Sequence, residues 1–283
     1  MEMGADGVSS WCWVGKGLGV AEFIPWTIPR VARGRRFTRP LLSIMVMGPG
    51  GGGGAGMTGA AGSVRCGGGG GAAGNIASVL LDPEFLPDTL FIRVFGGGAG
   101  GTVPSGNGSA GQATSVLTAP AVTALNSVVT VNGGNGGGGG TVAIGSGGTA
   151  GAATNASSQH YNYMAWTTKG AASGSNSGAV TGAAGVAFAM GGPSQSGGAG
   201  GGSMAADNLD YAGGAVTFTR PGSGDTLTRA GGAAPGGAGQ AGLYERLIWA
   251  MGGAGGATSS VGIAGAGGIG QYGCGGGGGG GGA

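Results

Sequence analysis

Uninterrupted glycine is the feature that most limits what this chain can fold into. Eight glycines occupy residues 275–282, and runs of five occupy residues 50–54, 67–71 and 136–140. Glycine has no side chain to bury and loses more backbone entropy on folding than any other residue, so these runs cannot build an ordinary hydrophobic core. Collagen is excluded as well, because the glycines cluster in runs instead of recurring at every third position.

The rest of the composition argues for order within an assembly. Glycine accounts for 80 of the 283 residues, charged residues for only 8%, and the formal net charge is +2. Disordered chains usually combine low hydrophobicity with high net charge, whereas the mean hydropathy here is +0.22. Since few large apolar side chains are present to offset the entropy of the glycines, we expect burial against other copies or other proteins.

No membrane segment or secretory leader is recognisable. No stretch approaches the ~20 apolar residues that span a bilayer. Glu2 and Asp6 stand where a signal peptide carries positive charge, and no apolar region follows them. We therefore expect no membrane span and synthesis in a cytoplasm.

The three cysteines do not form a recognisable site. Cys12, Cys66 and Cys274 lack the paired spacing of a zinc knuckle. Cys66 and Cys274 each directly precede a glycine run, where a small side chain is tolerated. This favours small filler over a disulfide, and no metal or other cofactor is expected.

Residues 1–47 differ in kind from the rest, and we assign them as an N-terminal arm. They hold three of the five tryptophans, and five arginines crowd into residues 30–39. Prolines at 25, 29 and 40 interrupt any helix. An extended, aromatic, basic arm gains more by lying on a partner than by folding on itself. The residues expected to dock it are Trp11, Trp13, Trp26, Arg30, Arg33, Arg35, Arg36 and Arg39.

Short β-prone runs repeatedly precede glycine-rich stretches along the chain. We assign residues 48–283 as a glycine-rich β body. Such runs cover residues 41–47, 89–95, 128–131 and 243–251. They are of strand length, rich in β-branched and aromatic residues, and bounded by breakers. Residues 215–219 and 226–229 predict a hairpin around a Pro-Gly turn, and the one helix expected covers residues 75–81.

Glycine runs serve as linkers, as phosphate-binding loops or as packed polyglycine-II helices. No Lys-Ser/Thr follows a run, so a phosphate loop is not supported. A helix of three residues per turn makes no internal hydrogen bonds, and only glycine lets several lie close enough to pair their N–H and C=O groups laterally. We therefore expect a mainly β fold with extensive irregular, polyglycine-II-like segments, in an oligomeric fibre or tip.

Three passages carry a family resemblance. Residues 37–40 (Phe-Thr-Arg-Pro) lead through a β-run into a glycine run, and residues 85–101 set a Leu-Pro-Asp-Thr-Leu strand before more glycine. Residues 265–283 close the chain with polyglycine. In these features the sequence resembles the glycine-rich virion proteins of tailed bacteriophages, described as tail-fibre or tail-tip proteins.

This resemblance implies a structural protein of a phage particle, homotrimeric and projecting. It would be made in the host cytoplasm and reside in the virion. Its partners would be copies of itself and, through the arm, other virion proteins. The resemblance does not distinguish tail from capsid.

Two clusters of residues, one of arginines and one of aromatic side chains, suggest a specific binding function. The arginines of residues 30–39 could contact nucleic acid, but the low net charge favours docking to an acidic protein surface, and no nucleic-acid partner is expected. An aromatic island could bind a host surface glycan, whereas the alternative is a buried cluster at a subunit interface. The residues of this island are His160, Tyr161, Tyr163 and Trp166.

No catalytic set emerges, and we expect that the protein is not an enzyme. Asp82, Glu84 and Asp88 alternate with prolines before a strand, which is more typical of a solvated turn than of a carboxylate pair for hydrolysis. A single histidine supports no Ser-His-Asp triad.

The leading hypothesis is a phage tail fibre or projecting tip involved in host attachment. One rival is a capsid decoration or scaffold protein without a receptor role. Another is a secreted glycine-rich surface or ice-binding protein, against which the missing signal peptide counts.

Overall fold

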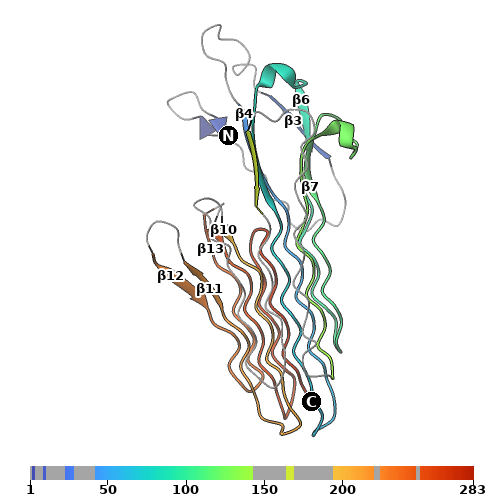
Figure 1. Ribbon diagram of the computed structural model, residues 1–283, viewed down its shortest axis with the longest axis vertical. Helices are drawn as coiled ribbons and strands as arrows, with labels where there is room; N and C mark the ends of the chain where they lie inside the picture. The colour runs from blue at the N-terminus through green and yellow to red at the C-terminus, as the bar shows by residue number, and fades with distance from the viewer. Residues whose placement is uncertain are drawn as a thin grey trace.

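The computed structural model describes residues 2–3, 9–10, 23–28, 42–142, 164–168, 194–219, 224–246 and 249–283. Figure 1 shows strands toward one end of an elongated molecule, which we call the strand end, and long extended segments running to the other. Helix in the described residues is limited to two 3-10 turns, η2 (Pro83–Phe85) and η3 (Ala124–Asn126). The expected β-type class is confirmed.

Two antiparallel sheets occupy the strand end. One has the order β3-β6-β7-β8 and the other the order β4-β5-β9. The strands of the first are β3 (Phe23–Thr27), β6 (Thr89–Arg93), β7 (Thr114–Leu117) and β8 (Ser127–Val131). Those of the second are β4 (Leu42–Met47), β5 (Ile76–Leu81) and β9 (Met164–Thr168). The strands expected over residues 41–47, 89–95 and 128–131 are therefore confirmed.

Smaller sheets complete the strand pairing. β11 (Val216–Thr219) and β12 (Thr226–Arg229) form the expected antiparallel hairpin. The run expected as one strand over residues 243–251 forms two, β13 (Tyr244–Arg246) and β14 (Trp249–Ala250), which pair with each other. β10 (Ser194–Gln195) runs parallel to β14, and β1 (Glu2–Met3) pairs with β2 (Ser9–Ser10).

The helix expected over residues 75–81 is wrong, because Ile76–Leu81 is β5, the central strand of its sheet. Both of its edges are paired, with β4 and with β9. Buried Ile76 and Val79 are β-branched and pack well on a pleated surface. Pairing on both edges thus outweighs a weak local helical preference.

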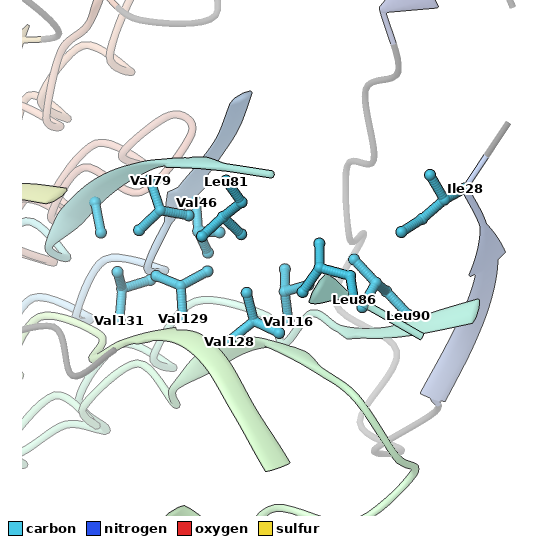
Figure 2. Packing of buried hydrophobic residues seen from close by; sticks show 11 residues of the cluster. Ile28, Val46, Val79, Leu81, Leu86, Leu90, Val116, Val128, Val129 and Val131 are labelled. Atoms are coloured by element: carbon cyan, nitrogen blue, oxygen red, sulfur yellow. The ribbon is translucent and has the colours of Figure 1, made fainter. Parts of the chain in front are cut away.

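The main hydrophobic core lies between the two larger sheets. Figure 2 shows Val79 and Leu81 of β5 facing Val129 and Val131 of β8, with Val46 of β4 beside them. All five side chains are buried. The core is small, and it covers only the strand end.

Beyond the strands, extended segments pair through their backbones instead of through side chains. Residues 48–57 run antiparallel to residues 66–75, with N–H···O=C bonds from Gly48 to Asn75, Gly51 to Ala72, Gly54 to Gly69 and Met57 to Cys66, all 2.8–2.9 Å long. Only every third residue donates to this neighbour. The intervening residues Gly52 and Ala55 donate to Ser109 and Gly106 of another segment. Each segment therefore bonds to several neighbours in different directions.

The segments form a close-packed bundle. Residues 251–259 exchange backbone hydrogen bonds with six others, in residues 196–204, 211–214, 230–232, 237–242, 265–271 and 275–282. Six is the largest number of equal rods that fit around one. The closing glycine run, residues 275–282, bonds to five segments and lies inside the bundle. Many backbone N–H and C=O groups of the glycine runs thus form hydrogen bonds with other segments of the same chain.

The bundle buries two cysteine thiols. Cys66 is 0% and Cys274 5% exposed, and neither forms a disulfide. Burial raises the pKa of both thiols, that of Cys274 to about 12. Cys12 lies outside the described residues, and the filler role expected for Cys66 and Cys274 agrees with their burial.

This burial predicts a pH dependence. The folded pKa of Cys274 is raised, so its contribution to stability is fully present below the ordinary pKa of 9.0 and is lost as pH rises toward about 12. Between pH 7 and pH 10 the loss should be on the order of 1 kcal/mol. Urea unfolding of the protein and of the Cys274→Ala variant at both pH values measures it. Equal pH dependence of the two proteins would contradict the prediction.

Candidate attachment surface at the loop end

The turns between extended segments gather at one end of the bundle, away from the larger sheets (Figure 1). Backbone bonds tie three of these turns to the ends of neighbouring segments: Gly59 donates to Gly282 (3.1 Å), Ser105 to Gly56 (3.2 Å) and Gly236 to Thr258. We call this region the loop end. It comprises residues 58–65, 102–106, 205–210, 233–236 and 259–264.

Large apolar side chains project from these turns. Val103, Leu209, Val261 and Ile263 are 73%, 59%, 87% and 94% exposed. Single exposed apolar residues are common, but four of them on turns held at one end of a narrow bundle provide apolar contact points for a partner. The loop end is therefore the candidate attachment surface.

A buried arginine holds two of the turns together. Arg65 is 0% exposed and donates from Nε to the Ser63 carbonyl and from Nη1 to the Gly59 carbonyl, both at 3.3 Å. Its Nη2 donates to Asn208 Oδ1, in the turn of residues 205–210, and to Sδ of Met204, which directly precedes that turn. The N–H of Gly62 also donates to Asn208 Oδ1, at 3.0 Å. Residues 58–65 and 205–210 are thereby fixed to each other.

Asp210 fixes a third turn. Its Oδ1 accepts from the Ser260 N–H at 2.7 Å, and its Oδ2 accepts from the Ser260 hydroxyl at 2.9 Å. The Thr258 hydroxyl accepts from the Tyr211 N–H at 2.6 Å. These bonds hold Val261 and Ile263 on an ordered turn, which lowers the entropy lost when a partner binds.

Of the aromatic island expected to contact a receptor, the structure describes only one residue, Trp166. His160, Tyr161 and Tyr163 lie outside the described residues. Trp166 belongs to β9, which pairs with β5 at the strand end. The structure thus places the strand of Trp166 away from the loop end.

Of the eight residues expected to dock the N-terminal arm, the structure describes only Trp26. Trp11, Trp13, Arg30, Arg33, Arg35, Arg36 and Arg39 lie outside the described residues. Trp26 is half-buried on β3, where it packs against the main core. Both β3 and β4 pair with strands of the body, so residues 23–28 and 42–47 are part of the strand end.

Sequence reasoning did not single out the loop-end residues. A usable signal exists, because each is an apolar residue beside turn-forming residues between two glycine-rich stretches. Examples are Val103-Pro104-Ser105 and Val261-Gly262-Ile263. Such residues have no strand to belong to, and this favours exposure on a turn.

In the described part of the chain, no group of three or more His, Cys, Asp or Glu side chains could hold a metal ion. No helix among those residues is long and apolar enough to cross a membrane. The turn that carries Asp82 and Glu84 is η2, where Asp82 caps the N-terminus by accepting from the Glu84 N–H at 3.0 Å. The sequence matches no protein-family model, and a search of curated proteins finds no relative.

Proposed function

We propose that this protein is a structural component of a bacteriophage virion, a tail fibre or projecting tip that takes part in host attachment. The observation that carries the proposal is the loop end. There, exposed apolar side chains lie on turns that are held by hydrogen bonds, at the end of a narrow hydrogen-bonded bundle. The family resemblance of residues 36–101 and 243–283 supplies the setting. The protein acts by mechanics and adhesion and catalyses no reaction.

The body of this fibre is a bundle of polyglycine-II helices. The three-residue period of the donors Gly48, Gly51, Gly54 and Met57 supports this assignment. Lateral backbone bonds in several directions resist bending and shear, because any displacement stretches many bonds together. Such a body transmits a force applied at its tip to the structure that holds its base.

Attachment to the particle occurs at the strand end, through residues 1–47. Two parts of this arm, β3 and β4, already lie there, at the far end from the apolar turns. This polarity is the one that an adhesive fibre needs. An acidic surface of another virion protein would receive the arginines of residues 30–39.

A trimer is the proposed oligomeric state, and it rests on the resemblance alone. Hydrogen bonds within one chain already pair many of the glycine segments. Light scattering of the purified protein should give a mass near three times 26.1 kDa. A stably folded species at the mass of one chain would overturn the trimer without affecting the adhesive role.

The adhesive role is tested by binding of the fluorescently labelled protein to a panel of bacterial strains. Because Val261 and Ile263 are almost fully exposed, carboxylates there should not disturb the fold. The Val261→Asp/Ile263→Asp double variant should bind about tenfold more weakly to any strain that the parent labels. Leu125→Asp is the matched control, since Leu125 is 77% exposed on η3 at the strand end.

Three results discriminate the alternatives. Loss of binding in the loop-end variant alone supports an adhesin with its receptor site at the loop end. Equal loss in both variants would contradict that site. Labelling of no strain would favour a capsid decoration or scaffold protein.

A further inference from the structure

Three backbone N–H groups of residues 48–57, spaced three residues apart, have no hydrogen-bond partner among the described residues. A helix of three residues per turn directs its N–H groups in three directions about 120° apart. The first row bonds to residues 66–75 and the second to residues 106–109. The third row is Gly50, Gly53 and Gly56, whose N–H groups bond to none of the described residues.

A matching row of acceptors occurs in the neighbouring closing run. The carbonyls of Gly276 and Gly279 accept from Gly71 and Gly68. Those of Gly275, Gly278 and Gly281 accept from Gly253, Gly256 and Ser259. The third row is Cys274, Gly277 and Gly280, whose carbonyls accept no hydrogen bond within the described part of the chain.

The two unpaired rows border the same position. A Cβ built on Gly53 would lie 1.9 Å from the Gly277 oxygen, so the rows are adjacent. A Cβ on Gly276 or Gly279 would point into this position and meet nothing closer than 3.2 Å, the N atoms of Gly53 and Gly56. By contrast, a Cβ on Gly278 would lie 2.0 Å from the Gly68 oxygen. The described residues therefore leave space for one more segment on this side of the closing run.

Burial and neighbours agree with an unfilled place in the bundle. Among the described residues, the closing run has five hydrogen-bonded neighbours, whereas residues 251–259 have six. Gly276, Gly277 and Gly279 are partly exposed, whereas Gly275 and Gly278 are buried. Gly50, Gly53 and Gly56 are themselves buried, and an unpaired buried N–H group is costly. A ligand that accepts from these three groups would recover that cost.

We propose that this position binds an extended glycine-rich segment of a partner polypeptide as an additional member of the bundle. Its carbonyls accept from Gly50, Gly53 and Gly56, and its N–H groups donate to the carbonyls of Cys274, Gly277 and Gly280. The mode is the counterpart, for three-residue helices, of adding a strand to a sheet edge. The binding position does not depend on the proposed virion role.

The geometry specifies the partner's sequence pattern. The row of Gly50 to Gly56 extends over ~19 Å, so about seven residues of the partner are in register. Rows of the partner that face the bundle must be glycine, since neighbouring backbones here leave no room for a Cβ. The row that faces solvent tolerates a side chain, which gives a Gly-Gly-X repeat. Proline in the repeat removes the donors that the carbonyls require.

The test uses the full chain and a synthetic peptide of three Gly-Gly-Ser repeats. Titration to millimolar peptide should shift the NMR amide signals of Gly50, Gly53 and Gly56 in a saturable way and slow their hydrogen exchange. A peptide of Gly-Pro-Ser repeats should not. No saturable shift at these three amides, or equal shifts with the proline peptide, would overturn the proposal.

Substitutions that fill the position provide the second arm. Gly279→Leu places a side chain in the position and should weaken binding of the Gly-Gly-Ser peptide about tenfold or more. Gly276→Leu serves the same purpose if Gly279→Leu does not fold. Gly262→Leu is the matched control, because a Cβ there meets only the Ser259 Oγ at 3.8 Å in an exposed turn. Undiminished binding by the folded Gly279→Leu or Gly276→Leu protein would also overturn the proposal.

Discussion

Replacing Gly278 with alanine should lower the free energy of unfolding by about 3 kcal/mol or more. The added Cβ would lie 2.0 Å from the carbonyl oxygen of Gly68 and 3.0 Å from the carbonyl carbon of Gly69, and backbone atoms cannot turn aside as a flexible side chain can. Separating the two segments would also lengthen the bonds from Gly68 to Gly279 and from Gly71 to Gly276, now both 2.8 Å. Urea unfolding followed by circular dichroism gives the change.

The next glycine provides the control. A Cβ on Gly279 meets the Gly56 N atom at 3.2 Å and points into the unfilled position. Gly279→Ala should therefore change stability by no more than about 1 kcal/mol, with the reduced entropy of the unfolded chain offsetting the tight contact. Similar losses for Gly278→Ala and Gly279→Ala would show that the close approach of backbones is not what requires glycine in this run.

Replacing Arg65 with alanine should destabilise the protein by about 3 kcal/mol, concentrated at the loop end. The change removes a fully buried guanidinium and leaves the Gly59 and Ser63 carbonyls and Asn208 Oδ1 without its N–H groups. Hydrogen exchange should accelerate in residues 58–65 and 205–210 and remain slow in β5 and β8. Mass-spectrometric exchange resolves these segments.

Arg65→Lys distinguishes charge from geometry. Lysine keeps the positive charge but cannot donate in the three directions that the guanidinium serves. We expect it to recover less than half of the stability lost in Arg65→Ala. Full recovery by lysine, or uniform acceleration of exchange throughout the chain, would contradict the role of Arg65 in joining the two turns.

The strands were predictable because their signals are local. The β-prone runs before Gly48 and within residues 89–95 are bounded by breakers, and the Pro-Gly turn after Thr219 marks a hairpin. Residues 75–81 failed because pairing on both edges, which no local pattern reveals, decides the structure of β5. The break between β13 and β14 falls within a run that contains no glycine or proline to mark it.

The arrangement of glycine segments could be predicted in kind but not in order. The expectation of lateral backbone pairing needs only the chemistry of glycine. Which segment neighbours which cannot follow from the sequence, because one glycine run is chemically identical to another and carries no side chain to specify a partner. The N–H groups of Gly50, Gly53 and Gly56 and the carbonyls of Cys274, Gly277 and Gly280, which have no partner among the described residues, become apparent only from the three-dimensional arrangement.

The candidate surface was harder to predict than the fold. Aromatic residues attract attention in a chain with so few of them, which is why the island at His160 and Trp166 stood out. The loop-end residues Val103 and Ile263 are ordinary in composition. Their significance comes from the meeting of distant turns, which Arg65 and Asp210 hold together.

The interior position of residues 275–282 has a consequence for biosynthesis. This segment follows all five of its bonded neighbours in the sequence, so a ribosome releases the surrounding segments before the one they surround. Contacts between residues so distant along the chain form slowly, because loop closure must precede them. Domains often fold during synthesis, which proceeds at about 5–20 residues per second. Here the five neighbouring segments are made before residues 275–282 are available to pair with them. Residues 275–282 therefore join the bundle after the five segments that bond to them.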